Sequence, residues 1–168
     1  MKSSGWFVCL CSVALACAGG AIHGDEARRT PVVDAVQKTR PCIVTLKIAK
    51  GNVDGETPER TGTGVIVDPR GYIVTSRHLI ANAAGIRVTL PDRTALTARV
   101  VAAEPDTDLA LLQVRPTRTL PALTPASGRD LLVGEPVIAI GHPYGYDYTV
   151  STGIISGRKM SESVEELS

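Results

Sequence analysis

The sequence predicts an all-β domain preceded by one short helix. Short apolar runs rich in β-branched residues recur between 42 and 157, and turn-forming residues separate them. The same region shows no alternation of strand and helix patterns, which argues against a parallel sheet. Many short strands with regular turn signals are typical of a sandwich or a barrel, and the pattern alone leaves both open.

The helix is expected at 31–41, in the segment PVVDAVQKTRP. Thr30 is a suitable N-cap residue, Pro31 fits the first turn, and Pro41 is expected to end the helix. The helical period would place three valines on one face: Val32, Val33 and Val36.

Each predicted strand is an apolar run that stops at a turn signal. The expected strands are 42–49, 64–68, 71–76, 86–90, 95–104, 109–114, 136–141 and 149–157. The turn DPRG at 68–71 has proline at its second position and predicts a hairpin. The turn PDRT at 91–94 predicts another hairpin. A polar loop at 51–63 and a proline-rich connection at 115–135 separate other strands, and one helical turn is expected within 79–85.

The first 21 residues differ from the rest of the chain. Lys2 precedes a short apolar stretch that ends in small residues, a pattern typical of a secretory signal peptide at 1–21. Residues 22–30 are expected to form a flexible tether. The apolar stretch is too short to predict a transmembrane span. The alternatives are an uncleaved anchor and lipid attachment at Cys17, although Ala14 stands where lipoprotein signals usually carry leucine.

The cysteines do not predict a disulfide within the exported domain. Three of the four lie in the signal segment: Cys9, Cys11 and Cys17. Cys42 follows them alone, next to apolar residues, and is expected to be a small buried side chain. Cysteine chemistry is therefore not expected to carry the function.

The composition argues against several classes of function. The 168 residues are 43% hydrophobic and 21% charged, with a formal net charge of +1. The chain is therefore not typical of disordered proteins, and no nucleic-acid partner is expected. No metal is expected, because the sequence has no HExxH or CxxC motif and no histidine–carboxylate cluster at ligand spacing. The segment TGTG at 61–64 lacks the lysine and helix of a phosphate loop and predicts a closely packed strand entry.

Three segments, in their order, resemble HtrA/Do-like proteases, which are bacterial serine endopeptidases of the trypsin fold. GTGVIVDPRGYIVTSRHLIANAAGIRVTLPDR (62–93) is similar to their glycine-rich strand pair, histidine corner and hairpin. AEPDTDLALLQV (103–114) is similar to their aspartate segment, and LLVGEPVIAIGHPYGYDYTVSTGIIS (131–156) to the run around their AIGNPFG motif. The resemblance implies a trypsin-like antiparallel β-barrel. Residues 31–160 would form the first barrel plus the opening strands of the second, and 161–168 a polar tail.

The resemblance also implies catalytic roles. His78 matches the general base and Asp108 the residue that orients it, in the chain order His, Asp, Ser. A serine hydroxyl becomes a good nucleophile when an imidazole takes its proton, and the aspartate fixes the imidazole tautomer. Asp106 lacks the match to the family register and is expected to be a solvated turn residue. His142 stands where the family usually has asparagine and is assigned no catalytic role.

Without the resemblance, structural rather than catalytic roles remain open for His78 and Asp108. A histidine at a strand-to-helix corner is more often structural than catalytic, so His78 by itself would not identify a site. Asp108 by itself would be a turn or cap residue before a strand. Only the matched order of the segments favours catalysis.

The nucleophile is missing from these 168 residues. The family carries it in a GNSGGP motif, and no G-x-S-G-G occurs anywhere in the sequence. The serines after Asp108 do not match this motif: Ser127, Ser151, Ser156, Ser161, Ser163 and Ser168. The chain by itself is therefore expected to be inactive.

Two hypotheses of different classes remain. In the first, the sequence is the N-terminal part of an exported, periplasmic or secreted serine endopeptidase that acts on polypeptides. In the second, the short chain is a non-catalytic binding or regulatory protein with half of a protease fold. The first is favoured, because both retained positions match the catalytic pattern. No cofactor is expected, and a homo-oligomer and peripheral association with the envelope are left open.

Overall fold

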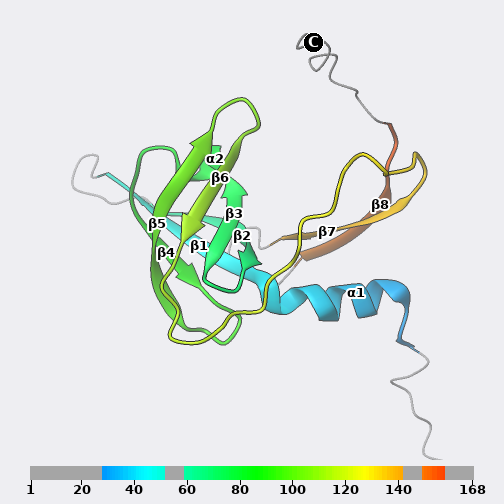
Figure 1. The fold of residues 1–168 in the computed structure, drawn as a ribbon, viewed down its shortest axis with the longest axis horizontal. Helices are drawn as coiled ribbons and strands as arrows, with labels where there is room; N and C mark the ends of the chain where they lie inside the picture. The colour runs from blue at the N-terminus through cyan, green and yellow to red at the C-terminus, as the bar shows by residue number, and fades with distance from the viewer. Residues whose placement is uncertain (1–27, 52–58, 142–148, 158–168) are drawn as a thin grey trace, which may run out of the picture.

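The computed structural model describes residues 28–51, 59–141 and 149–157, which form a closed barrel and a separate pair of strands (Figure 1). The barrel strands are β1 (Ile43–Lys50), β2 (Glu59–Asp68), β3 (Tyr72–Ser76), β4 (Ala83–Thr89), β5 (Ala95–Glu104) and β6 (Leu109–Gln113). Their order is β1-β2-β3-β6-β5-β4, with β4 returning to β1, and every pair is antiparallel. The all-β prediction is confirmed, and closure of the sheet selects the barrel over the sandwich.

The chain enters the barrel through α1 (Pro31–Thr39) and a 3-10 turn, η2 (Arg40–Cys42). The hydroxyl of Thr30 accepts a hydrogen bond from the Val33 N–H at 3.3 Å, which confirms the predicted cap. No residue of α1 is fully buried, so the predicted valine face does not enter the barrel core. None of the helices in the described ranges is long and apolar enough to span a membrane.

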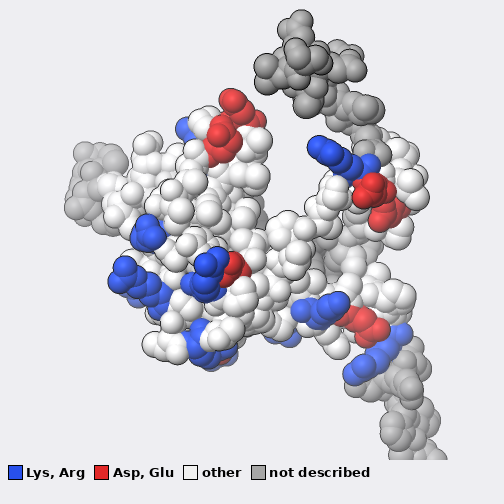
Figure 2. Space-filling view, in the orientation of Figure 1, with Lys and Arg blue, Asp and Glu red and all other residues white. Residues whose placement is uncertain are grey.

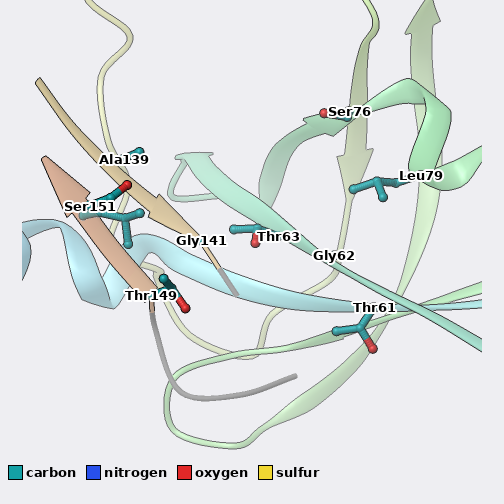
Figure 3. Close-up of a pocket in the computed structure, with 10 residues that line it drawn as sticks. Thr61, Gly62, Thr63, Ser76, Leu79, Ala139, Gly141, Thr149 and Ser151 are labelled. Carbon is teal, nitrogen blue, oxygen red and sulfur yellow. The ribbon is translucent and has the colours of Figure 1, made fainter. Parts of the chain in front are cut away.

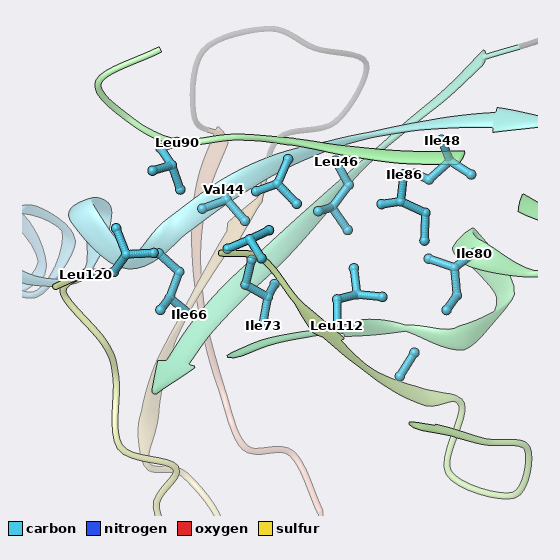
Figure 4. Close-up of a cluster of buried hydrophobic side chains, with 13 residues drawn as sticks. Val44, Leu46, Ile48, Ile66, Ile73, Ile80, Ile86, Leu90, Leu112 and Leu120 are labelled. Carbon is cyan, nitrogen blue, oxygen red and sulfur yellow. The ribbon is translucent and has the colours of Figure 1, made fainter. Parts of the chain in front are cut away.

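The barrel interior is filled by aliphatic side chains (Figure 4). Alternate residues of β1 point inward, and Leu46 and Ile48 are fully shielded from solvent. Ile73 from β3 and Leu112 from β6 meet them with no exposed surface. Each such side chain contributes about 1.5–3 kcal/mol on burial. Leu120, from the proline-rich connection, lies at one end of this cluster and is also buried.

The hairpin turns follow the predicted chemistry. The Gly71 N–H donates to the Asp68 carbonyl at 3.0 Å and closes the DPRG turn. Gly71 has φ of +93°, and an added Cβ would lie 2.6 Å from the Val114 carbonyl oxygen, so glycine is required there. In the second turn, the Arg93 N–H donates to the Leu90 carbonyl at 2.9 Å.

Two strand starts and the helical turn differ from the prediction. The helical turn is α2 (Arg77–Ile80) rather than a turn within 79–85, because residues 83–85 belong to β4 and pair with β1. β2 begins at Glu59, inside the segment expected to be a loop, because its first residues pair with the far end of β1. β4 begins at Ala83 rather than at residue 86 and likewise pairs with β1. The extra residues of β2 and β4 pair with the backbone N–H and C=O groups of the long strand β1. This pairing makes them strand although their local sequence is polar.

The glycines of TGTG occupy β2, as expected for a strand entry. A Cβ added at Gly64 would lie 2.7 Å from the Ile73 side chain in the core. A Cβ added at Gly62 would lie 2.6 Å from a methyl group of Leu79. The close packing predicted for this segment is therefore confirmed.

β7 (Pro136–Gly141) and β8 (Thr149–Ile154) form an antiparallel pair outside the barrel (Figure 1). The hydrogen bond from the Gly134 N–H to the Ile155 carbonyl, at 2.7 Å, extends the pairing beyond the strands. No residue of either strand is fully buried, and Ile154 is 63% exposed. Both strands were predicted, but the pair has no core of its own.

Cys42 is buried and free, as predicted. Burial raises the pKa of its thiol, which disfavours the reactive thiolate. The predicted signal peptide at 1–21, His142 and the predicted polar tail at 161–168 lie outside the described residues.

Candidate active site

His78 lies on α2 (Arg77–Ile80), a single helical turn that follows β3 directly. The residue two positions before the helix, Thr75, is buried, and its hydroxyl donates to the Thr63 carbonyl at 2.8 Å. This bond ties β3 to β2 just before the chain turns the corner. The backbone that carries the His78 side chain therefore follows directly from a strand end held by hydrogen bonds, not from a loop.

Asp108 reaches this corner through the pairing of β3 with β6. Ser76, the last residue of β3, lies opposite Leu109, the first residue of β6. The residue after Ser76 and the residue before Leu109 are consequently neighbours in space. Strand register thus brings together two side chains that are 30 positions apart in the sequence.

Three hydrogen bonds hold Asp108 against the corner. The Arg77 N–H donates to the Asp108 carbonyl at 2.8 Å, and the His78 N–H donates to Asp108 Oδ1 at 2.9 Å. His78 Nδ1 lies 2.6 Å from Asp108 Oδ2. Asp108 has φ of +54°, in the left-handed region that aspartate tolerates better than most residues. The surrounding bonds hold this uncommon backbone conformation and aim the carboxylate at the ring.

The same contacts define the protonation of the pair. The hydrogen bond from the His78 side chain, followed by that from its backbone N–H, holds the pKa of Asp108 below its ordinary value. The carboxylate is therefore ionised at neutral pH and can only accept, so Nδ1 of His78 carries the proton that it donates. In the tautomer with its proton on Nδ1, Nε2 is the acceptor of the ring. Nε2 forms no hydrogen bond to any of the described residues.

Asp106, the competing carboxylate, takes no part in this arrangement. Its backbone N–H donates to the Glu104 carboxylate at 3.3 Å, within the turn between β5 and β6. In the described structure its side chain makes no hydrogen bond to His78. Of these two carboxylates, that of Asp108 is the one hydrogen-bonded to His78 in the structure.

A hollow of about 450 Å³ lies beside this corner, between the barrel and the β7–β8 pair (Figure 3). Its barrel wall is formed by Thr61, Gly62, Thr63, Ser76 and Leu79, and its other wall by Ala139, Ile140, Gly141, Thr149 and Ser151. Among the described residues, no charged side chain lines it. Hydroxyl and aliphatic groups thus make up the described part of the lining.

The pair itself is open to solvent. The His78 side chain is 64% exposed and the Asp108 side chain 48% exposed. Across the described ranges, no three His, Cys, Asp or Glu side chains gather closely enough to hold a metal ion.

Comparison with known proteins shows what this corner belongs to. Residues 62–167 match the family model described as a trypsin-like peptidase domain, and this range includes both His78 and Asp108. The chain belongs to the trypsin-like peptidase family.

Within this family the chain is similar to Do-like proteases, as its sequence segments predicted. It is 44% identical over 103 residues to Protease Do-like 1, chloroplastic, of Arabidopsis thaliana, covering 61% of this chain and 24% of that protein. It is also 44% identical over 103 residues to a probable periplasmic serine endoprotease, DegP-like, of Hahella chejuensis, covering 61% of this chain and 22% of that protein. The chain spans less than a quarter of the length of either relative.

Sequence reasoning missed two features of this trypsin-like corner. The first is that the Asp108 carboxylate accepts two hydrogen bonds from His78, one from its backbone N–H and one from its ring. The second is the hollow, whose two walls come from segments far apart in the chain. Neither has a local signal, because both depend on which strands become neighbours.

Proposed function

We propose that this chain carries the acid–base half of a Do-like serine endopeptidase site. His78 is the general base, and Asp108 is the residue that orients it. The observation that supports this most is the 2.6 Å contact between His78 Nδ1 and Asp108 Oδ2, which leaves Nε2 available as an acceptor. A satisfied structural histidine would more often be buried, whereas this ring is exposed beside a hollow.

The proposed chemistry follows from that tautomer. Nε2 takes the proton of a serine hydroxyl while the hydroxyl oxygen bonds to the carbonyl carbon of the substrate peptide. The imidazolium, stabilised by the Asp108 carboxylate, then gives this proton to the departing amine as the C–N bond breaks. Water repeats the cycle on the acyl-enzyme.

The serine must come from a motif that the 168 residues do not contain, since no G-x-S-G-G is present. We therefore propose that these residues alone do not hydrolyse peptide bonds. In the proposed enzyme, the hollow beside Ser76 and Leu79 receives part of the polypeptide substrate. Its uncharged lining favours unfolded chain segments with neutral side chains.

A chimera tests the proposal. Residues 22–157 would be joined to the part of the Hahella chejuensis relative that follows its matched region, which the family resemblance implies carries a G-x-S-G-G segment. We expect hydrolysis of unfolded casein by the chimera. Substitution Asp108→Asn should lower kcat by about 10⁴-fold, because it favours the wrong tautomer. The matched control Asp106→Asn removes the neighbouring carboxylate and should retain activity.

Two results would count against the proposal. One is an active chimera whose rate is unchanged by His78→Ala. The other is hydrolysis by the 168-residue chain itself that His78→Ala abolishes, which would show that one of its own serines is the nucleophile.

Export to the periplasm forms a further part of the proposal. It rests on the signal-like residues 1–21 and on the relatives whose names describe periplasmic proteins. We expect the mature protein in the periplasmic fraction with residues 1–21 removed, as measured by mass spectrometry. Retention in the cytoplasm with an intact N-terminus would contradict this part alone.

One observation favours the second candidate, a non-catalytic binding protein. Apolar side chains stand exposed before and on the β7–β8 pair, among them Leu132 at 69% and Val133 at 64%. Exposed apolar groups of this kind favour association. Sedimentation of the 168-residue chain, with Leu132→Ser/Val133→Ser as the comparison, would show whether these residues drive it.

A further inference from the structure

The outer wall of the barrel carries a cationic groove that crosses four neighbouring strands, β6, β5, β4 and β1. We define this basic groove by its four cations: Lys47, Arg87, Arg99 and Arg115. It consists of two hollows of about 320 Å³ and about 200 Å³, and Thr97 lines both. Figure 2 shows blue side chains gathered over the side of the barrel where β4 and β5 lie.

Strand register explains why these cations share one face. Lys47 pairs with Arg87, and Arg87 pairs with Thr97, so a single row crosses β1, β4 and β5. Arg99 is two residues beyond Thr97 and pairs with Gln113 of β6. Paired residues and alternate residues of a strand project from the same face of a sheet. All of them therefore point outward, while the intervening residues fill the core.

The groove is not neutralised by the rest of the described structure. None of the four cations forms an ion pair within the described ranges, whereas Arg70 and Arg118 each pair with an aspartate. Of the carboxylates in the described ranges, only that of Glu59 lines either hollow. The guanidinium of Arg99 donates to the Gln113 side chain, which fixes part of its orientation. A fixed guanidinium presents paired donors that match a carboxylate.

We infer that the basic groove binds an acidic segment of polypeptide in an extended conformation. The four strands are spaced so that the groove spans about 14 Å, which an extended chain crosses in about five residues. Two separate hollows accept side-chain carboxylates beside Arg99 and beside Arg87. The groove thus matches alternate acidic side chains along one strand.

The lining argues against the other anionic partners. Among the described residues, no aromatic side chain lines either hollow, so this lining offers no stacking platform for nucleic-acid bases. None of the exposed large hydrophobic side chains of the described ranges lines it either, so this lining has no group suited to enter a lipid surface. Two concave hollows also fit projecting side chains better than a flat layer of headgroups.

The basic groove is separate from the proposed active site. Asp108 immediately precedes β6, whereas Arg115 follows the opposite end of the same strand. Peptide binding at the groove can therefore be measured without catalysis, and its failure would leave the proposed function standing.

The test uses the 168-residue chain and a fluorescein-labelled hexapeptide of alternating glutamate and serine. Fluorescence anisotropy at low ionic strength gives the Kd. The double variant Arg99→Gln/Arg115→Gln should weaken binding by about tenfold, as expected for loss of two charge-assisted contacts. The matched control Lys38→Gln/Arg40→Gln removes two cations near α1, away from the groove, and should change Kd less than about twofold. Thermal melts by circular dichroism verify that both variants fold.

Equal weakening by both double variants would overturn the inference, because net charge rather than the groove would then explain binding. Tighter binding of phosphatidylglycerol vesicles or of a single-stranded oligothymidylate, lost in Arg99→Gln/Arg115→Gln, would overturn the choice of partner. Free inorganic phosphate, added at the same concentration of negative charge, should not abolish peptide binding. If it does, the groove is an unspecific anion site instead.

Discussion

The barrel and the β7–β8 pair are built from similar strands but differ in what their side chains contact. In the barrel, Leu46, Ile73 and Leu112 are completely shielded from solvent. In the β7–β8 pair, Val137, Val150 and Ile154 are at least 38% exposed. Closure of the sheet gives the barrel an interior, whereas two strands alone have none. The His78–Asp108 pair lies on the part of the molecule that has its own core.

This difference explains how the corner can hold a defined geometry. Asp108 is fixed by three hydrogen bonds to residues that follow β3, and β3 is a central strand between β2 and β6. The hollow beside it depends on both regions, since Ser151 of β8 forms part of its far wall. The barrel therefore holds the His78–Asp108 pair by itself, whereas the hollow beside the pair needs the β7–β8 strands for one of its walls.

Core truncation should separate the two regions most clearly. Leu46→Ala in the barrel should lower the free energy of unfolding by about 3–4 kcal/mol, because it leaves a cavity among shielded side chains. Ile154→Ala in β8 should change it by less than about 0.5 kcal/mol, since that side chain is already exposed. Urea denaturation followed by circular dichroism measures both. Similar losses from the two variants would mean that the regions share one core.

Two glycines with nearly the same backbone conformation provide a finer comparison. Gly71 has φ of +93° and Gly134 has φ of +91°. Gly71→Ala should cost about 2–3 kcal/mol, because strain adds to the clash with the Val114 carbonyl. Gly134→Ala meets no atom within 4 Å and should cost about 1 kcal/mol from backbone strain alone. Melting temperatures of the two variants would test this order, and a larger loss at Gly134 would contradict it.

Acid should affect the barrel through its turns. Hydrogen bonds from the Thr94 backbone and from Arg118 lower the pKa of Asp92 to about 2. Because this pKa is below the ordinary value of about 3.9, the ionised carboxylate stabilises the fold above pH 4, and that stabilisation is lost as pH falls toward 2. Asp92→Asn should therefore lower stability slightly at neutral pH and flatten its decline between pH 4 and pH 2. Denaturation midpoints of both chains across that range measure this. If Asp92→Asn declines as steeply as the unsubstituted chain, the Asp92 carboxylate does not contribute to the acid sensitivity.

Much of the fold was predictable because its signals are local. Proline and glycine in DPRG mark the hairpin, Thr30 and Pro31 mark the start of α1, and β-branched runs mark the strands. The starts of β2 and β4 were wrong, because polar residues there are strand only through pairing with β1. The local sequence of a strand does not indicate how long its partner strand is.

The site divides in the same way. The order of His78, Asp108 and their flanking segments could be recognised in the sequence, and their catalytic roles stay a prediction. The positive φ of Asp108 and the second hydrogen bond to its carboxylate could not be foreseen, because both depend on the register of β3 with β6. The basic groove could not be predicted either. The net charge of +1 does not indicate a cluster of cations, and only the strand register brings these four together.

The most direct test of the account is the tautomer of His78 in the 168-residue chain, measured by ¹⁵N NMR of the imidazole nitrogens. Comparison with His78→Gln assigns its signals among the three histidines. At about pH 9, where an ordinary imidazole is neutral, we predict a proton on Nδ1 and an unprotonated Nε2. This pattern should change in Asp108→Asn. A proton mainly on Nε2, or a pattern unaffected by Asp108→Asn, would contradict the claim that the barrel alone builds a general base.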